Sequence, residues 1–159
     1  VMQSCSKNLA MTGWRVGFVF AEVEIIKNLT ILTGQSTTSV SAISQYAALA
    51  GLQNAGQIIP EINLEMEMRR NFFVDELNKL FGSTIKKPAC GLYVFVNLKD
   101  LGVKDNDSVK FCERVLNEAN VAIVPGAAFG REGYVRFSFG ERLKELQTAL
   151  EQLAMYLRN

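Results

Sequence analysis

The sequence predicts a chain of the α/β class that ends in an α+β-like small domain, in which helices pack on a small, mostly antiparallel sheet. Two observations support this fold. From residue 92 onward, short runs rich in β-forming residues alternate with amphipathic helical patterns. Before residue 60 the apolar pattern is mainly helical, with one strand signal. We therefore expect two parts, residues 1–59 and residues 60–159.

The first part is expected to contain one strand and two helices. Arg15–Ala21 is short and apolar, which is typical of a buried strand. Apolar residues then follow a helical stripe from Ile25 to Leu32, with Gly34 as the predicted stop. A polar loop precedes a second, alanine-rich helix over Ser41–Gln53. A lone strand leaves its edges unpaired, so this part is expected to belong to a larger domain.

The second part is expected to begin with a long helix, from Pro60 to about Leu80, that ends at Gly82. Two helices and three strands follow. Asp107 is the predicted N-cap of the next helix. Its apolar positions are expected at Val109, Cys112, Val115 and Leu116, and those of the last helix at Leu143, Leu146, Leu150, Leu153 and Leu157. The predicted strands are Leu92–Asn97, Val121–Val124 and Tyr134–Phe139.

Composition limits the classes of function. Of the 159 residues, 48% are hydrophobic and the net charge is +1, which suits a packed core and predicts no nucleic-acid partner. The apolar runs are too short for a membrane span. Histidine is absent, which removes serine–histidine and cysteine–histidine nucleophile systems and the usual zinc–water sites, so no metal is expected. Three cysteines at no zinc spacing fit reduced thiols in the cytoplasm.

A cluster of reactive residue types lies near the start of the chain, in the run Ser4 to Gly17. A lysine such as Lys7, desolvated near the cation Arg15, becomes a nucleophilic amine that can form a Schiff base with an aldehyde. Ser4 and Arg15 supply a hydroxyl and a planar guanidinium, which suit a phosphate dianion. Spacing alone favours the alternative, an ordinary exposed lysine before a core strand. The chain begins at Val1, and with this motif so near the start we expect a fragment.

A second cluster surrounds Arg136, which alternates with Val135 and Phe137 on a predicted strand and so points to the opposite face from them. An arginine on a half-buried strand between aromatic residues requires a fixed anionic partner, and a carboxylate held by two hydrogen bonds would serve. A structural ion pair with a nearby glutamate is equally compatible with the residues alone.

Both clusters resemble motifs of the class I aminotransferases, which depend on pyridoxal 5'-phosphate. Ser4-Cys5-Ser6-Lys7 and the tail Ala10-Met11-Thr12-Gly13-Trp14-Arg15-Val16-Gly17 are similar to the cofactor attachment motif, and Pro125-Gly126-Ala127-Ala128-Phe129-Gly130 with Arg136-Phe137-Ser138 to the family's later loop and strand. The resemblance implies that Lys7 forms the cofactor Schiff base. It also implies that Ser4 and Arg15 bind the cofactor phosphate and that Arg136 binds the substrate α-carboxylate.

The resemblance further implies that residues 1–59 are the end of the large cofactor-binding domain and residues 60–159 the small domain. The expected reaction moves an amino group from an amino acid, with aspartate favoured, to a 2-oxo acid such as 2-oxoglutarate. The complete protein is expected to be a cytoplasmic homodimer, and this fragment alone to be inactive. Alternatives are another enzyme of the same fold, such as a C–S lyase or a different aminotransferase, or a non-catalytic interaction module.

Overall fold

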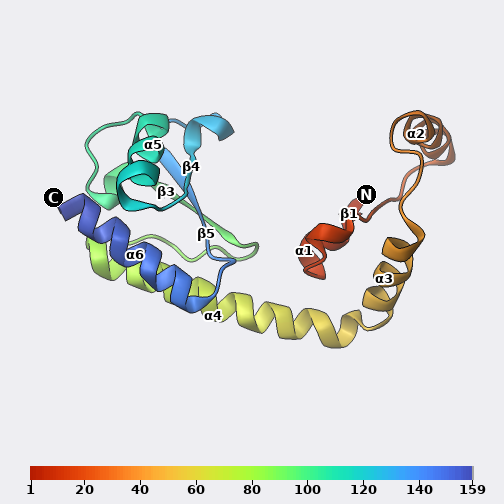
Figure 1. The fold of residues 1–159 in the computed structure, drawn as a ribbon, viewed down its shortest axis with the longest axis horizontal. Coiled ribbons are helices and arrows are strands. Elements are labelled where there is room, and N and C mark those ends of the chain that lie inside the picture. Colours follow the sequence, from red (N-terminus) through yellow and green to blue (C-terminus); the bar gives the residue numbers. More distant parts are fainter. Residues whose placement is uncertain (159) are drawn as a thin grey trace. The chain divides into compact units, whose positions relative to one another are not determined.

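The computed structural model describes residues 1–158, which divide into two compact units. The N-terminal unit is Val1–Leu64, and the C-terminal unit runs from Glu65 to the end of the described chain. Figure 1 traces the elements of both units in chain order. The predicted boundary after residue 59 and the division after Leu64 both fall within one long helix, α4 (Ala55–Phe81).

The N-terminal unit contains a two-stranded ribbon where the sequence predicts a single buried strand. Strand β1 (Met2–Ser4) pairs antiparallel with β2 (Gly17–Val19), and a four-residue helix α1 (Cys5–Asn8) and the 3-10 turn Thr12–Trp14 connect them. The prediction of a buried strand over 15–21 is therefore wrong in length and burial, because β2 has only β1 beside it and Val19 and Phe20 remain exposed. A small core forms around the ribbon from Cys5, Leu9, Val16 and Ala48.

The two helices after the ribbon differ in how closely their ends follow the sequence signals. Helix α2 (Val23–Ser36) continues through Gly34, so the predicted stop is wrong. A glycine costs a helix only about 1 kcal/mol, and the helix gains hydrogen bonds from the Thr33 and Ser36 hydroxyls to carbonyls one turn earlier. None of the α2 residues is buried. Helix α3 (Ala42–Gln53) matches the predicted range.

The long helix α4 begins before the predicted start at Pro60. It starts at Ala55, because the Asn54 carbonyl accepts hydrogen bonds from the Gln57 and Ile58 amides and so opens the first turn. Pro60 lies inside the helix, beyond its first turn, so the missing N–H leaves the Gly56 carbonyl without its usual partner four residues later. The predicted end is confirmed, since Gly82 follows Phe81 with φ +62°.

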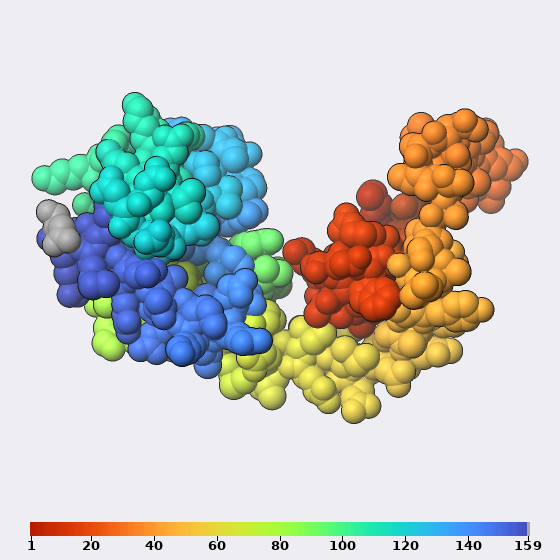
Figure 2. Space-filling view, viewed as in Figure 1, coloured from red at the N-terminus to blue at the C-terminus, as the bar shows by residue number. Residues whose placement is uncertain are grey.

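The C-terminal unit is a three-stranded antiparallel sheet with helices packed on it, as the sequence predicts. The strands β3 (Tyr93–Asn97), β4 (Val124–Pro125) and β5 (Tyr134–Ser138) lie in the order β3-β5-β4. The predicted strand over Val121–Val124 is wrong except at Val124, because only Val124 and Pro125 pair with β5. Two 3-10 turns, Leu98–Leu101 and Gly126–Phe129, follow β3 and β4. Helix α5 (Ser108–Ala119) contacts β4, β5 and α6 (Leu143–Arg158). The space-filling view in Figure 2 shows this unit, in yellow-green to blue, as one packed body.

The core of this unit decides which face of each helix is buried. Asp107 caps α5 as predicted, accepting a hydrogen bond from the Lys110 amide at 3.0 Å. The predicted apolar stripe of α5 is wrong at Val109 and Leu116, which are exposed, because the turn of the helix places Phe111 and Ala119 inward with Cys112 and Val115. In α6, Leu146, Leu150 and Leu153 are buried as predicted, whereas Leu143 at the helix start is 42% exposed.

The sheet has one face in the core and one face outside it. Val94, Val96, Val135 and Phe137 point into the core that α4, α5 and α6 complete. Side chains alternate along a strand, so Tyr93, Phe95, Tyr134 and Arg136 share the other face.

Among residues 1–158, none of the helices combines the length and the apolarity that crossing a bilayer requires.

Candidate active site

The ribbon of the N-terminal unit brings the predicted cofactor residues to one end. Ser4, the last residue of β1, pairs with Gly17, the first residue of β2, and the Cys5 amide donates to the Val16 carbonyl at 3.1 Å. Arg15 directly precedes this pairing and Lys7 follows Ser4 by less than one helical turn. All three side chains belong to exposed residues, so they are accessible at this end of the ribbon.

Local hydrogen bonds hold the backbone of this segment. The Ser4 hydroxyl caps α1 by accepting from the Ser6 amide at 3.1 Å. The Cys5 carbonyl accepts from the amides of Leu9 and Met11. Cys5 itself is buried, and its side chain anchors the segment in the small core. The segment is therefore fixed from inside while Lys7 faces outward.

Arg15 lies in an uncommon backbone conformation. Its φ is +54°, in the left-handed region that non-glycine residues seldom occupy. Its Nη1 donates to the Thr12 carbonyl at 3.3 Å, so the side chain folds back over the turn. Strained residues of this kind cluster at ligand clamps and active sites. The remaining guanidinium donors have no protein acceptor among the described residues.

Two glycines near this site differ in what they allow. A Cβ at Gly17 would lie 2.9 Å from the Gln3 carbonyl oxygen, so the ribbon requires glycine there. A Cβ added at Gly13 would have no atom within 4 Å, so nothing in the described chain requires glycine at that position.

Lys7 takes part in none of the ion pairs formed among residues 1–158.

The second predicted site, in the C-terminal unit, is an arginine held between two aromatic rings. The guanidinium carbon of Arg136 lies 4.2 Å from the centre of the Tyr93 ring and 4.8 Å from that of Phe129. Such cation–π contacts contribute about 0.5–2 kcal/mol each, depending on exposure. Arg136 also sits on the central strand, opposite Phe95 on β3 and Val124 on β4. Its backbone is thus fixed on both sides.

The Arg136 side chain is not satisfied by the protein residues around it. Its Nε is buried and has no hydrogen-bond partner among the described residues. None of the ion pairs formed by residues 1–158 includes Arg136, so the alternative of a structural ion pair with a glutamate is not what the structure contains. Buried polar atoms are almost always paired in proteins, and an exception requires an explanation such as a missing ligand.

The turn that carries Phe129 is anchored to α5 by residues that sequence reasoning did not single out. Glu132 Oε1 accepts from the Ser108 amide at 2.6 Å and from the Gly133 amide at 3.1 Å. The Ser108 hydroxyl accepts from the Ala127 amide at 3.2 Å. Ser108 is fully buried, the one buried polar residue among those described. Its position directly after the predicted N-cap could have marked it as a helix-start residue, but not as a partner of the turn.

Gly126 lets the same turn close against the sheet. A Cβ there would collide with the carbonyl oxygens of Arg131 and Tyr134. We expect Gly126→Ala to destabilise the C-terminal unit by about 3 kcal/mol or more, the upper end of the range for overpacking. Gly82→Ala is the matched control: its φ of +62° strains alanine, but no atom lies within 4 Å. That variant should cost only about 1 kcal/mol. Urea unfolding of both variants measures the difference, and equal losses would contradict the collision.

Hydrogen bonds shift the titration of the groups around this turn. Donation from the Ser108 hydroxyl and amide and from the Gly133 amide lowers the pKa of Glu132 below its ordinary 4.5. The Lys110 amide and ammonium lower the pKa of Asp107. Burial, and then the charge of Glu132, raise the pKa of the Cys112 thiol to about 11. At neutral pH, Glu132 is therefore a carboxylate and Cys112 an uncharged thiol.

The lowered carboxyl pKa values predict acid sensitivity of the C-terminal unit. A group whose folded-state pKa is depressed stabilises the fold above its unfolded pKa, and this contribution is lost as the pH falls through the folded value. For Glu132 the loss begins below about pH 4.5, its ordinary pKa. Glu132→Gln should be less stable than the parent at pH 7 and lose less on acidification. Parallel dependence of both proteins on pH, in denaturant titrations from pH 7 to pH 3, would contradict this.

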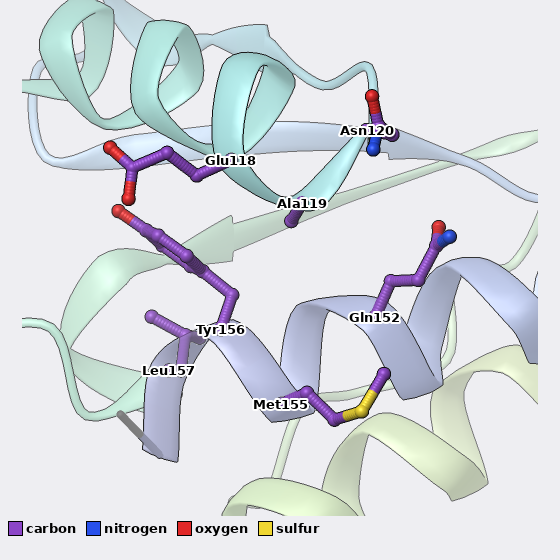
Figure 3. Close-up of a pocket in the computed structure, with 7 residues that line it drawn as sticks. All are labelled: Glu118, Ala119, Asn120, Gln152, Met155, Tyr156 and Leu157. Atoms are coloured by element: carbon purple, nitrogen blue, oxygen red, sulfur yellow. The ribbon is translucent and has the colours of Figure 1, made fainter.

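A groove of about 670 Å³ lies between the C-terminal ends of α5 and α6. Figure 3 shows Glu118, Ala119 and Asn120 on one side, and Gln152, Met155, Tyr156 and Leu157 on the other. The one charged side chain that lines it is the carboxylate Glu118. The groove is therefore unsuited to a phosphate or a carboxylate ligand, and it contains none of the residues that the motifs indicate.

Each unit therefore carries one of the two predicted features: the N-terminal unit has an exposed lysine near a serine and an arginine, and the C-terminal unit has an arginine without an ion-pair partner on its sheet. The family model for aminotransferase class I and II matches residues 1–153. The chain belongs to this family.

Individual relatives agree with this assignment. An aspartate aminotransferase from Geobacillus stearothermophilus is 34% identical over 99% of this chain, and an aromatic-amino-acid aminotransferase of Thermococcus litoralis is 35% identical over 99%. The crystal structure of an aromatic aminotransferase from Pyrococcus horikoshii matches with a TM-score of 0.87 and 36% identity over 99% of this chain. The chain spans 40% of the length of these two curated relatives and 42% of that crystallised chain.

Proposed function

We propose that this chain is the C-terminal part of a pyridoxal-phosphate-dependent aminotransferase that moves the amino group of aspartate to 2-oxoglutarate. Membership of the aminotransferase family supports the reaction class and implies the cofactor. We favour aspartate as the amino-group donor because the relative from Geobacillus stearothermophilus is named an aspartate aminotransferase. Under this proposal, residues 1–59 belong to the large cofactor-binding domain and residues 60–159 form the small domain.

Arg136 carries the proposal. A guanidinium held between Tyr93 and Phe129, with a buried Nε that has no partner, is prepared for a planar anion. A carboxylate fits this requirement, because two parallel N–H···O bonds match its geometry. Every amino acid and every 2-oxo acid carries a carboxylate next to the reacting carbon. Binding it at Arg136 fixes one end of the substrate and so orients the Cα–H bond.

The residues at the ribbon end fit the cofactor. Lys7 is an accessible amine without an ion-pair partner, as attachment to an aldehyde requires. Ser4 Oγ and the free donors of Arg15 are assigned to the phosphate. When bound, the cofactor supplies the electron sink for the reaction. With the cofactor and substrate bound, a free Lys7 Nζ would take the Cα proton and return it as general acid, a role worth about 10²–10⁴ in rate.

The remaining parts of the proposal concern the complete protein. We propose that it is a cytoplasmic homodimer and that residues 1–159 alone do not transaminate, because the chain spans only 40% of its curated relatives. An aromatic amino acid is the second candidate substrate. Relatives at 35% and 36% identity are named aromatic aminotransferases. The names of the relatives therefore do not distinguish aspartate from an aromatic amino acid as the substrate.

Borohydride reduction of the complete, cofactor-loaded protein tests the proposal. Reduction fixes the cofactor permanently to the amine that holds it, and peptide mass mapping then locates the tag. We expect the tag on Lys7, and a tag on any other residue would overturn the assignment. Rates with aspartate and with an aromatic amino acid, each paired with 2-oxoglutarate, decide between the two substrates.

A further inference from the structure

The turn between β4 and β5 has hydrogen bonds within itself and further hydrogen bonds to the start of α5. Within the turn, the Arg131 amide donates to the Gly126 carbonyl at 2.9 Å and the Gly130 amide to the Ala127 carbonyl at 3.0 Å. Outside it, the links to α5 are those of Glu132 and Ser108 described above. The strands β4 and β5 hold the two ends of the turn, and the Leu98 amide donates to the Gly133 carbonyl at 2.9 Å. The two links to α5 add the attachment at its side.

Phe129 is the residue of the turn that reaches the proposed carboxylate site. Its ring covers the Arg136 guanidinium at 4.8 Å and meets the Phe95 ring edge-on at 6.0 Å. Phe129 is nevertheless 50% exposed, so packing in the hydrophobic core does not fix the position of its ring. A displacement of the turn would therefore move the ring off Arg136 and free the guanidinium to rotate.

We propose that Glu132 is a positioning residue for the substrate carboxylate: by fastening the β4–β5 turn to the start of α5, it keeps Phe129 on Arg136 and the guanidinium plane ready for the ligand. This inference rests on the proposed role of Arg136. The anchor is 2.6 Å long at the Ser108 amide and joins a fully buried residue to an ionised one. Charge-assisted bonds of this kind are about twice as strong as neutral ones.

The charges around Glu132 support its ionised form as the anchor. It accepts from the first amide of α5, where the helix dipole favours an anion. Asp107 lies at the same helix end, where its negative charge repels that of Glu132. Lys110 balances the Asp107 charge, because its Nζ lies 2.9 Å from the Asp107 carboxylate. Arg131 beside Glu132 is directed to the Tyr134 ring, at 5.0 Å from its centre. No cation within residues 1–158 forms an ion pair with Glu132, so hydrogen bonds from uncharged donors of Ser108 and Gly133 hold it.

Nuclear magnetic resonance on the 159-residue chain tests the positioning without cofactor or activity. Stacked rings shift the Arg136 Nε–Hε proton to high field, and Arg136→Lys identifies that signal by removing it. We expect the shift to shrink in Glu132→Ala and to be largely restored in Glu132→Gln, whose amide oxygen can still accept. Asp107→Ala is the matched control, because it removes the other α5 cap without touching the turn, and it should leave the signal in place. An unchanged signal in a folded Glu132→Ala variant would overturn the proposal.

Steady-state kinetics of the complete, cofactor-loaded protein give the second test. Glu132→Ala should raise KM for the amino acid about tenfold, in the range of coupling within one hydrogen-bonded network. Reaction with the matching amine that lacks the carboxylate should be unchanged, and in an Arg136→Lys background Glu132→Ala should add nothing. Equal loss for amino acid and amine would mean a general structural effect and would overturn the positioning role. If Arg136→Lys itself left KM unaltered, the proposed function would fail instead.

Discussion

Lys7→Ala in the complete protein is expected to abolish transamination, with a rate loss of about 10⁴ or more, because one amine serves two roles. In the proposed function it holds the cofactor and moves the Cα proton, a role worth up to about 10⁴ by itself. The exposed Lys7 has no ion pair, so its removal should leave the fold intact. Single-turnover measurements with aspartate give the rate, and thermal unfolding checks the structure.

Two further variants separate these causes. Lys7→Arg keeps the positive charge but offers no amine for attachment, so it should be as inactive as Lys7→Ala. Lys27→Ala removes another lysine of the same unit, on α2, and should retain the parent rate. Substantial activity in Lys7→Arg would show that charge rather than covalent attachment matters at this position, and the proposed role of Lys7 would fall.

Arg136→Ala is expected to reduce kcat/KM for amino acids by about 30-fold to several thousand-fold. The estimate corresponds to the roughly 2–5 kcal/mol that is lost when one partner of a buried, hydrogen-bonded charge pair is removed. Arg136 stacks between two rings and has a buried, unsatisfied Nε, so no other side chain at this place offers the same donors. The ratio of kcat/KM between parent and variant measures the loss.

Arg136→Lys is the informative companion. Lysine keeps the charge but not the planar pair of donors, and it stacks less well on aromatic rings. Its kcat/KM should therefore lie between those of the parent and of Arg136→Ala. The stability of Arg136→Ala at neutral pH should fall by no more than the two cation–π contacts contribute, about 1–4 kcal/mol in sum. A variant with parent-like kcat/KM would show that the carboxylate binds elsewhere.

The C-terminal sheet could be predicted well from the sequence because its signals are local. β3 and β5 carry dense runs of β-forming residues, and the alternation around Arg136 correctly placed that residue on the face opposite Val135 and Phe137. The stripe of α5 failed at Val109 and Leu116, because several apolar positions compete for the inward face and packing against β4, β5 and α6 decides among them. Such a choice cannot be made from periodicity alone.

The N-terminal unit and the detail of the sites depended on contacts distant in sequence. β1 is three residues long and has no pattern of its own, so its pairing with β2 was not foreseen. The rings on Arg136 come from Tyr93 and Phe129, on separate segments that only the fold brings together. The Glu132–Ser108 anchor joins positions whose residue types are common on any surface. The motifs therefore indicated the candidate site residues, and the fold showed which other residues contact them and hold them in place.

The place of Arg136 on the middle strand links successful folding to competence for binding. Its neighbours on β3 and β4 fix the alignment of β5, and a slip by one residue would exchange the two faces of that strand. The guanidinium would then be driven into the hydrocarbon interior, and the valine and phenylalanine side chains beside it into water, a mispairing far too costly to persist. The register that buries Val135 and Phe137 is therefore the same register that places Arg136 on the outer face of the sheet.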